Sequence, residues 1–267
     1  MKQTLFLLLL IICYSCGNDQ SSDADEQANT AAQQTKVQQD SIRQLYQQYI
    51  EELEVKMPTK CVAERNKINP ADEAPLDTAF FVLREQLKRI VEKRDIFSLL
   101  NYIDQNIKVS FGEENGQKAF VQKWGLDTPE KIAVSELWPT LEQLLNLGGA
   151  FHDDQLFEAP YLGPCWPTED PYTQGAITGS GVRMRKAPNL TSPVVTNLSY
   201  DIVNYIETTP HKTVVGSREH PWIKVKTAKD QIGFVYGQFY RSPIDYRMVF
   251  QKNEAGSWKI VSLVAGD

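Results

Sequence analysis

The side chains best suited to metal chemistry in this chain form one short run, His152-Asp153-Asp154. An imidazole and two carboxylates are possible ligands for a divalent cation. Neighbouring residues of an extended segment point to opposite faces, so without further ligands this run suits a single ion poorly. We therefore expect a solvated acidic turn at this place, no metal site and no cofactor.

Motifs for catalysis are also missing from the sequence. It contains no G-x-S-x-G, no H-E-x-x-H and no Gly-rich phosphate loop. The histidines His152, His211 and His220 lack a suitable cysteine partner, because neither Cys61 nor Cys165 follows a motif that would make it a nucleophile. We expect a protein that is not an enzyme. The formal net charge of -6 disfavours a nonspecific grip on phosphates, so no nucleic-acid partner is expected either.

The N-terminus carries a targeting signal. Residues 1–15 read MKQTLFLLLLIICYS, a basic start and a short apolar run that predict a secretory signal peptide. Ser15-Cys16-Gly17 resembles the cleavage site of bacterial lipoproteins, and Ser-Cys after a Leu-rich stretch is common among lipoproteins of Bacteroidetes-type bacteria. The resemblance implies a lipid on Cys16 and a protein of the cell envelope that is anchored to a membrane. A plain secretory signal cut nearby is the alternative.

The segment after this signal is polar. Residues 16–36 are rich in Asp, Ser, Gln, Asn and Ala and nearly lack large apolar side chains. Such a segment cannot bury enough surface to offset the entropy of ordering, so it is expected to be a flexible tether.

Two cysteines are left for the folded body. Cys13 leaves with the signal peptide, and Cys16 is the expected acylation site. Cys61 and Cys165 remain as an even pair in an oxidising compartment, which predicts a disulfide. Two buried free thiols are the alternative, because the sequence does not show whether the geometry allows a bond.

Residues 37–173 predict a helix-rich α+β domain. Apolar residues recur at helical spacing in four segments, which are residues 37–56, 78–93, 117–124 and the stretch after Ser135. Asp77 is the expected N-cap of the second helix, and Gly148-Gly149 is expected to end the fourth. Prolines then crowd residues 160–171, which predicts an irregular connection to the next domain.

Between the second and third helices the pattern is less regular. Residues 95–107 begin as a short helical or turn unit, in which Phe97, Leu100 and Ile103 could face the core. Residues 109–112 then predict a short strand.

The C-terminal residues 243–267 predict a β-hairpin. Two strand-like runs, residues 246–251 and 258–264, flank a turn that contains Gly256. A solitary hairpin is marginal in water, so these strands are expected to pair with strands of the first domain, including residues 109–111. The Gly-x-Trp-x-Ile run resembles the closing hairpin of cone-shaped α+β folds related to nuclear transport factor 2. That resemblance implies a discontinuous α+β domain with an insertion.

The inserted residues 174–242 carry the most informative pattern. Short β-type runs alternate with turns from Gly181 to Tyr240, and a Trp-x-Lys-Val strand precedes a Gly-Phe-Val strand. This pattern resembles the bacterial SH3-like (SH3b) domain, which implies a small β-barrel used for binding. The residues expected in its core are Val182, Val195, Ile202, Trp222, Val225 and Val235.

The same resemblance points to a binding function. In that family the ligands include cell-wall peptides and partner proteins. Aromatic side chains suit extended peptides, and five could line a groove here: Tyr200, Tyr205, Phe234, Tyr236 and Tyr240. Ordinary half-exposed strand positions are the alternative for these rings. We thus expect a noncatalytic envelope lipoprotein that binds peptide, peptidoglycan or a protein partner. The rival is a small-ligand-binding or enzymatic α+β domain, with the barrel as a structural accessory.

Overall fold

The computed structural model describes residues 33, 36–37, 39–47, 60–64, 66–167 and 170–266. The predicted signal peptide, the predicted acylation site at Cys16 and almost all of the predicted tether lie outside these residues. Two separate units are formed by residues 1–43 and 44–267. Residues 39–43 of the first unit and 44–47 of the second are helical, as predicted, and the rest of the predicted helix, residues 48–56, is not described. Within the described ranges, no helix is both long and apolar enough to cross a bilayer.

The longest helix of the second unit, α2 (Thr78–Lys93), has the predicted bounds. The Asp77 side chain caps it by accepting a hydrogen bond from Phe80 N at 2.9 Å. The helix ends at Arg94, whose φ of 53° is left-handed and cannot continue the turn. Local signals, a cap and a periodic apolar stripe, thus fixed this element.

The segment after α2 differs from the prediction. Helix α3 covers only Ile96–Leu100, and strand β3 covers Ile103–Lys108, where a helical unit and then a later strand at 109–112 were predicted. Phe97 is 81% exposed and does not face the core. Ile103 and Ile107 are both buried, and a spacing of four residues fits one helical turn as well as two strand periods. Pairing with the C-terminal strand β14 decides between them.

Three shorter helices follow. They are α4 (Gln117–Lys123), α5 (Pro129–Val134) and α6 (Leu137–Asn146). The first and last were predicted, whereas α5, which buries none of its residues, was not. Ser135 receives a hydrogen bond from Leu137 N at 3.2 Å and donates to the Trp124 carbonyl oxygen at 2.6 Å, so it joins the start of α6 to the end of α4.

The α+β part of this unit is built on a five-stranded sheet with the order β3-β14-β13-β5-β4. Its other strands are β4 (Ala150–Phe151), β5 (Leu156–Ala159), β13 (Arg247–Lys252) and β14 (Trp258–Val264). The predicted C-terminal hairpin, β13 and β14, is confirmed. It pairs with β5 on one side and, in parallel, with β3 on the other, so its partner is Ile103–Lys108 and not residues 109–111.

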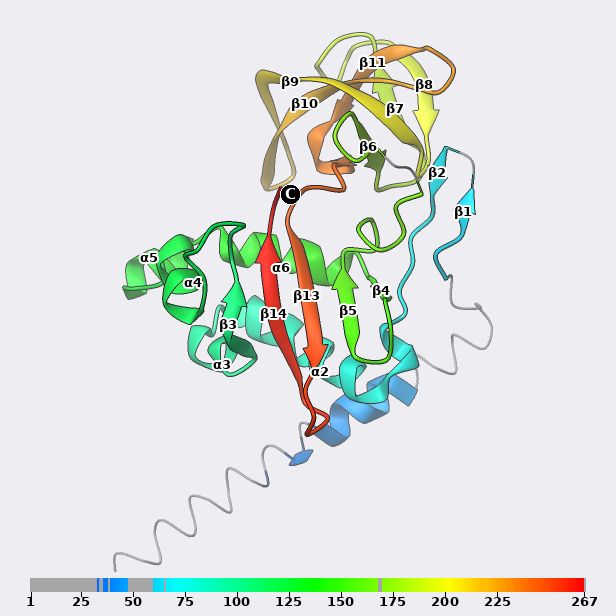
Figure 1. Ribbon diagram of the computed structural model, residues 1–267. Helices are drawn as coiled ribbons and strands as arrows, with labels where there is room; N and C mark the ends of the chain where they lie inside the picture. Colours follow the sequence, from blue (N-terminus) through cyan, green and yellow to red (C-terminus); the bar gives the residue numbers. More distant parts are fainter. Residues whose placement is uncertain are drawn as a thin grey trace, which may run out of the picture. The chain divides into compact units, whose positions relative to one another are not determined.

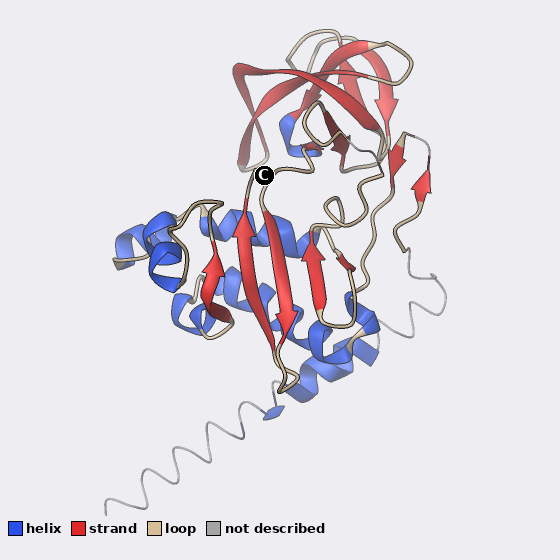
Figure 2. Ribbon diagram, viewed as in Figure 1, coloured by secondary structure: helices blue, strands red, loops and turns tan. Residues whose placement is uncertain are grey.

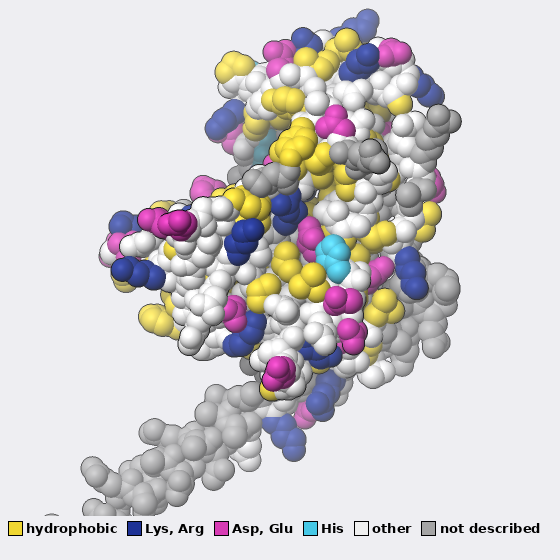
Figure 3. Space-filling model, in the orientation of Figure 1, with side chains coloured by type: hydrophobic (Ala, Val, Ile, Leu, Met, Phe, Trp, Pro, Cys, Tyr) yellow, Lys and Arg dark blue, Asp and Glu magenta, His cyan; other side chains and the backbone are white. Residues whose placement is uncertain are grey.

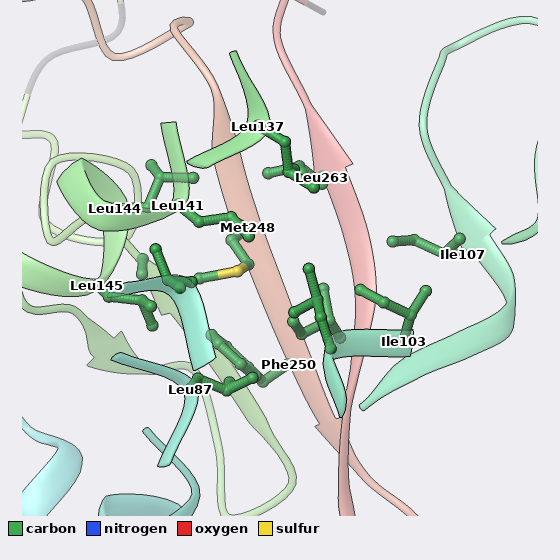
Figure 4. Packing of buried hydrophobic residues seen from close by; sticks show 14 of the residues in the cluster. Leu87, Ile103, Ile107, Leu137, Leu141, Leu144, Leu145, Met248, Phe250 and Leu263 are labelled. Atoms are coloured by element: carbon green, nitrogen blue, oxygen red, sulfur yellow. The ribbon is translucent and has the colours of Figure 1, made fainter. Parts of the chain in front are cut away.

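Helices α2 and α6 cover one face of this sheet (Figures 1 and 2). Their apolar side chains meet those of β3, β13 and β14 in the main core (Figure 4). At one end of it, the Phe80 ring packs against the rings of Phe157, Phe250 and Trp258, with centroid distances between 4.2 and 5.0 Å. The helices and strand that precede the residue range 174–242 and the hairpin that follows it therefore share one core. Helices packed on a sheet in this way confirm a mixed α+β fold.

A second, antiparallel sheet lies between β5 and β13 in the sequence. It has seven strands in the order β12-β6-β9-β10-β11-β7-β8 and curls into a half-barrel (Figure 1). The strands are β6 (Gln174–Ile177), β7 (Val182–Arg185), β8 (Val194–Leu198), β9 (Ile202–Val215), β10 (Arg218–Lys226), β11 (Ile232–Tyr236) and β12 (Tyr240–Arg241).

The inside of the curled sheet holds most of the predicted barrel core. Val182, Val225 and Val235 are buried there, and Val195 packs against them from a half-buried position. Trp222 is buried outside this cluster, where its Nε1 donates to Thr213 Oγ1 at 2.8 Å. Ile202 belongs to a different cluster, which lies where the two sheets meet and which we call the junction cluster. Its members are Ile68, Ala71, Ala150, Tyr161, Leu162, Cys165, Ala176 and Ile202.

The segment before α2 also runs along this junction. It contains β1 (Ala63–Glu64), β2 (Lys67–Ile68) and a short 3-10 helix, η1 (Ala74–Leu76). Ile68 N donates to the Tyr200 carbonyl oxygen, and Ile202 N donates to that of Asn66, both at 2.9 Å. Cys61 and Cys165 lie at disulfide distance, with Cα atoms 5.1 Å apart, as predicted.

Candidate functional site

Two of the five predicted groove aromatics lie together on the curled sheet. The rings of Tyr205 and Tyr240 have centroids 6.0 Å apart, and Tyr205 is 40% exposed. Tyr240 packs over Gly175, where a Cβ atom would lie 2.3 Å from its hydroxyl oxygen. Burial raises the pKa of the Tyr240 hydroxyl, and the charge of Asp245 raises it further. The Tyr205 ring is thus exposed at the surface, whereas the Tyr240 ring is packed against Gly175 and the sheet.

The other three rings lie elsewhere. Tyr236 is 5% exposed. Its hydroxyl donates to the carbonyl oxygens of Thr213 at 2.9 Å and Arg218 at 3.0 Å, and so it links β9 to β10 near their hairpin turn. Phe234 lies on the outer side of β11 beside Lys224, whose Nζ is 5.8 Å from the ring centroid. Tyr200 sits in a turn with a φ of 58°. Among these five described residues, Tyr205–Tyr240 is the only ring contact.

A groove opens instead at the edge of the half-barrel. Strand β8 is the last strand of the sheet and pairs with β7 alone among the described strands. Beside it lies a cavity of about 390 Å³, which we call the seam groove. The rest of its lining comes from the start of β9, the turn between β10 and β11, and residues 66 and 67. Its lining residues are Asn66, Lys67, Thr196, Asn197, Leu198, Ser199, Asp201, Ile202, Thr227, Ala228, Lys229 and Gln231.

Local hydrogen bonds hold the walls of the seam groove. Asp201 Oδ2 accepts from Ser199 N at 2.6 Å, which fixes the turn between β8 and β9. Thr227 Oγ1 accepts from Gln231 N at 3.2 Å, which fixes the turn between β10 and β11. Both walls are therefore preformed before any ligand arrives, so the lining polar groups keep their positions.

The remaining polar side chains of the groove are available for a ligand. No described residue forms a hydrogen bond or an ion pair with the side chains of Lys67, Asn197, Lys229 or Gln231. Two of these are cationic, whereas the carboxylate Asp201 is already engaged by a backbone N–H. The groove thus favours a polar ligand with negative charge.

The α+β part has its own groove, between α2 and α6. It measures about 480 Å³; Val91, Trp138 and Leu145 form its apolar floor, and the charged residues Lys88, Glu92, Arg94 and Glu142 form its rim. Arg94 donates to the Ala133 carbonyl oxygen, and Glu142 pairs with Arg218 at 3.2 Å. These rim contacts are structural, and the groove brings no nucleophile or imidazole to its floor in the described residues.

The run His152-Asp153-Asp154 forms the expected exposed turn. His152 Nε2 is 2.8 Å from Glu158 Oε2, and Glu158 Oε1 is 4.0 Å from Arg247 Nε. Sequence reasoning missed this trio because its members come from three separate segments. In the part of the chain that the structure describes, no group of three or more His, Cys, Asp or Glu side chains has metal-binding geometry.

The seam groove was also missed by sequence reasoning. Its residues come from positions near 66, 196–202 and 227–231, and none of them forms a motif with another. The one usable signal was the polar pair Thr196-Asn197 within the block of β-type runs from Gly181 to Tyr240. Comparison with known proteins adds no name to these features, because no protein-family model, curated protein or solved structure matches this chain.

Proposed function

We propose that this protein is a binding protein of the bacterial cell envelope, and that its half-barrel is an SH3-like module that takes an extended peptide of a partner protein into the seam groove. The observation that carries the proposal is the outer edge of β8, which pairs with no other described strand and forms one wall of a preformed polar groove. An edge strand offers a row of N–H and C=O groups that an added strand can pair with.

The dimensions and charges fit an acidic peptide. The five residues of β8 extend over about 16 Å at roughly 3.3 Å per residue. This edge is long enough to pair with a short extended peptide. Lys67 and Lys229 attract carboxylates, and Asn197 and Gln231 supply further hydrogen bonds to side chains. Main-chain pairing gives affinity in this mode of recognition, and the side-chain contacts give specificity.

The proposed location rests on the predicted leader. A lipid on Cys16 would hold the mature chain at a membrane, and residues 17–36 would give the folded body reach. A binding module on a tether can meet partners in the envelope over the length of that tether.

Paired proline and alanine variants at Thr196 and Asn197 test strand addition. Successive N–H groups of a strand point to opposite edges, so one of these two donates toward β7 and the other toward the groove. Linear peptides are selected by phage display on the mature chain with Cys16→Ser. One proline variant should lose at least about tenfold in affinity for them at unchanged stability, and clearly more than the alanine variant at the same position, because proline has no N–H to donate.

Two results would contradict strand addition. One is equal affinity of all four variants for the selected peptides. The other is retention on purified peptidoglycan with no peptide enriched, which would assign the half-barrel to the cell wall. Lys67→Glu with Lys229→Glu should weaken acidic peptides only, and a matched pair of reversals outside the groove, Lys93→Glu with Lys118→Glu, should leave them unchanged.

A further inference from the structure

The outer face of the half-barrel combines cationic and apolar side chains. Residues directly opposite each other in antiparallel strands project to the same face. One row across the sheet is Lys224 on β10, Phe234 on β11, Arg185 on β7 and Val194 on β8. Their neighbours Ile223, Val235 and Met184 are buried in the barrel core, so this row points outward.

Two further pairs extend the face. Lys226 on β10 is opposite Ile232 on β11, and Arg183 on β7 is opposite Asn197 on β8. Ile232 is 52% exposed and Val194 is 44% exposed, so large apolar side chains stand in solvent among the cations. Figure 3 shows hydrophobic, basic and acidic side chains intermingled over the upper part of the molecule, which Figure 1 shows to be the seven-stranded sheet.

The charge of this face is opposite to that of the whole protein. Four cations lie on it: Arg183, Arg185, Lys224 and Lys226. Two carboxylates face them, since Glu207 is 3.0 Å from Lys224 Nζ and Asp230 is 2.8 Å from Lys226 Nζ. Four positive and two negative charges leave +2, although the chain carries -6. Arg185 donates to the Ser192 carbonyl oxygen, and Arg183 has no ion-pair partner among the described residues.

We propose that this outer face docks on the surface of an anionic lipid bilayer. Basic residues near such a surface are attracted to its headgroups, and exposed apolar side chains such as Ile232 and Val194 gain by entering the headgroup–acyl boundary. A bilayer accounts for the exposed apolar side chains as well as the cations, whereas an acidic peptide accounts for the cations alone. The face shares Asn197 with the seam groove, but none of its cationic or apolar side chains lines that groove, so the proposal stands without peptide binding there.

Docking also has a physical use for a lipoprotein. A lipid attached near the N-terminus anchors the chain but does not by itself orient the folded body. A lipid at Cys16 would confine the protein to a membrane, and the outer face would orient the half-barrel against it.

Vesicle sedimentation of the mature chain with Cys16→Ser, which carries no lipid, tests the proposal. The protein should bind vesicles of phosphatidylglycerol and phosphatidylcholine, bind pure phosphatidylcholine at least tenfold more weakly, and dissociate as salt is raised. Arg183→Glu and Ile232→Ser should each weaken binding about fivefold or more, and together by more than either alone.

Matched substitutions on the α+β part serve as controls. Lys118→Glu makes the same reversal of charge at an exposed site, and Val134→Ser removes an exposed apolar side chain from α5. Both should bind vesicles like the parent chain. Equal binding of all variants, equal binding to neutral vesicles or no binding at low salt would overturn the proposal, and circular dichroism of each variant excludes unfolding as the cause.

Discussion

The carboxylate of Asp77 joins the first turn of α2 to the end of β13. It accepts hydrogen bonds from Phe80 N and from Lys252 Nζ, each at 2.9 Å. Burial alone raises the pKa of this carboxyl, but the two hydrogen bonds and the charge of Lys252 outweigh burial and hold the pKa below its ordinary value. The charged form of Asp77 therefore stabilises the fold.

Asp77→Asn separates this charge from helix capping, because asparagine caps about as well as aspartate. At neutral pH the variant should lose about 1 kcal/mol of unfolding free energy, less than a whole charged hydrogen bond contributes, because asparagine keeps the oxygen acceptor and loses only the charge. A depressed pKa stabilises above the unfolded value of about 3.9, and this contribution disappears as the pH falls through the folded value. Urea unfolding at a series of pH values measures the difference, which should shrink in acid. Asp154→Asn, at an exposed turn, is the control, and a loss that persists unchanged in acid would contradict the charge argument.

At the scale of elements, the short edge pair β6–β12 depends on one glycine. Tyr240 lies over Gly175, and the Tyr205 ring stacks beside it. A side chain at position 175 would displace the Tyr240 ring from its place against the barrel core. The pairing of Tyr240 with Ile177 would lose its packing support as a result.

Gly175→Ala should therefore destabilise the half-barrel by about 1–3 kcal/mol, the usual range for overpacking. The pKa of Tyr240, which burial raises, should fall toward the ordinary tyrosine value of about 10 as the ring becomes exposed. Ultraviolet titration of tyrosinate measures this shift, and Tyr240→Phe identifies the signal. Gly112→Ala is the control, since its Cβ would meet nothing closer than 3.7 Å. An unchanged titration in Gly175→Ala would show that the ring stays buried.

Elements with strong local signals were predictable from the sequence. The Asp77 cap located α2, and Gly256 between two alternating runs located β13 and β14. Strand β3 was misplaced because its two isoleucines fit either period, and only its pairing with β14 settles the choice. The candidate site was less predictable, since the seam groove exists only once the sheet has curled and brought Lys67 beside Lys229. The tyrosine groove stays a prediction, with Tyr205 and Tyr240 as its adjacent pair.

At the scale of the molecule, the two sheets share a junction that also supports the seam groove. The buried guanidinium of Arg241 on β12 donates to Gln143 Oε1 on α6 at 2.8 Å and to the Tyr246 carbonyl oxygen. On the other side, Asn66 and Lys67 line the groove, and the chain just before them carries Cys61. Cys165 lies in the junction cluster, so the disulfide ties this groove wall to the connection between the sheets.

Loss of the disulfide should therefore weaken both stability and peptide binding. The two cysteines are 104 residues apart, and closing a loop of that size stabilises the folded state by about 4–5 kcal/mol in the chain-entropy model. Cys61→Ala with Cys165→Ala should lower the unfolding free energy by up to this amount, and a reductant should bring the parent chain to the same denaturation midpoint without affecting the double variant. Peptide affinity should fall in conditions where the double variant is still folded, because Asn66 and Lys67 are then held by fewer constraints. If the denaturation midpoint of the parent chain is the same with and without reductant, the junction is held by its apolar cluster and by Arg241 and not by the disulfide.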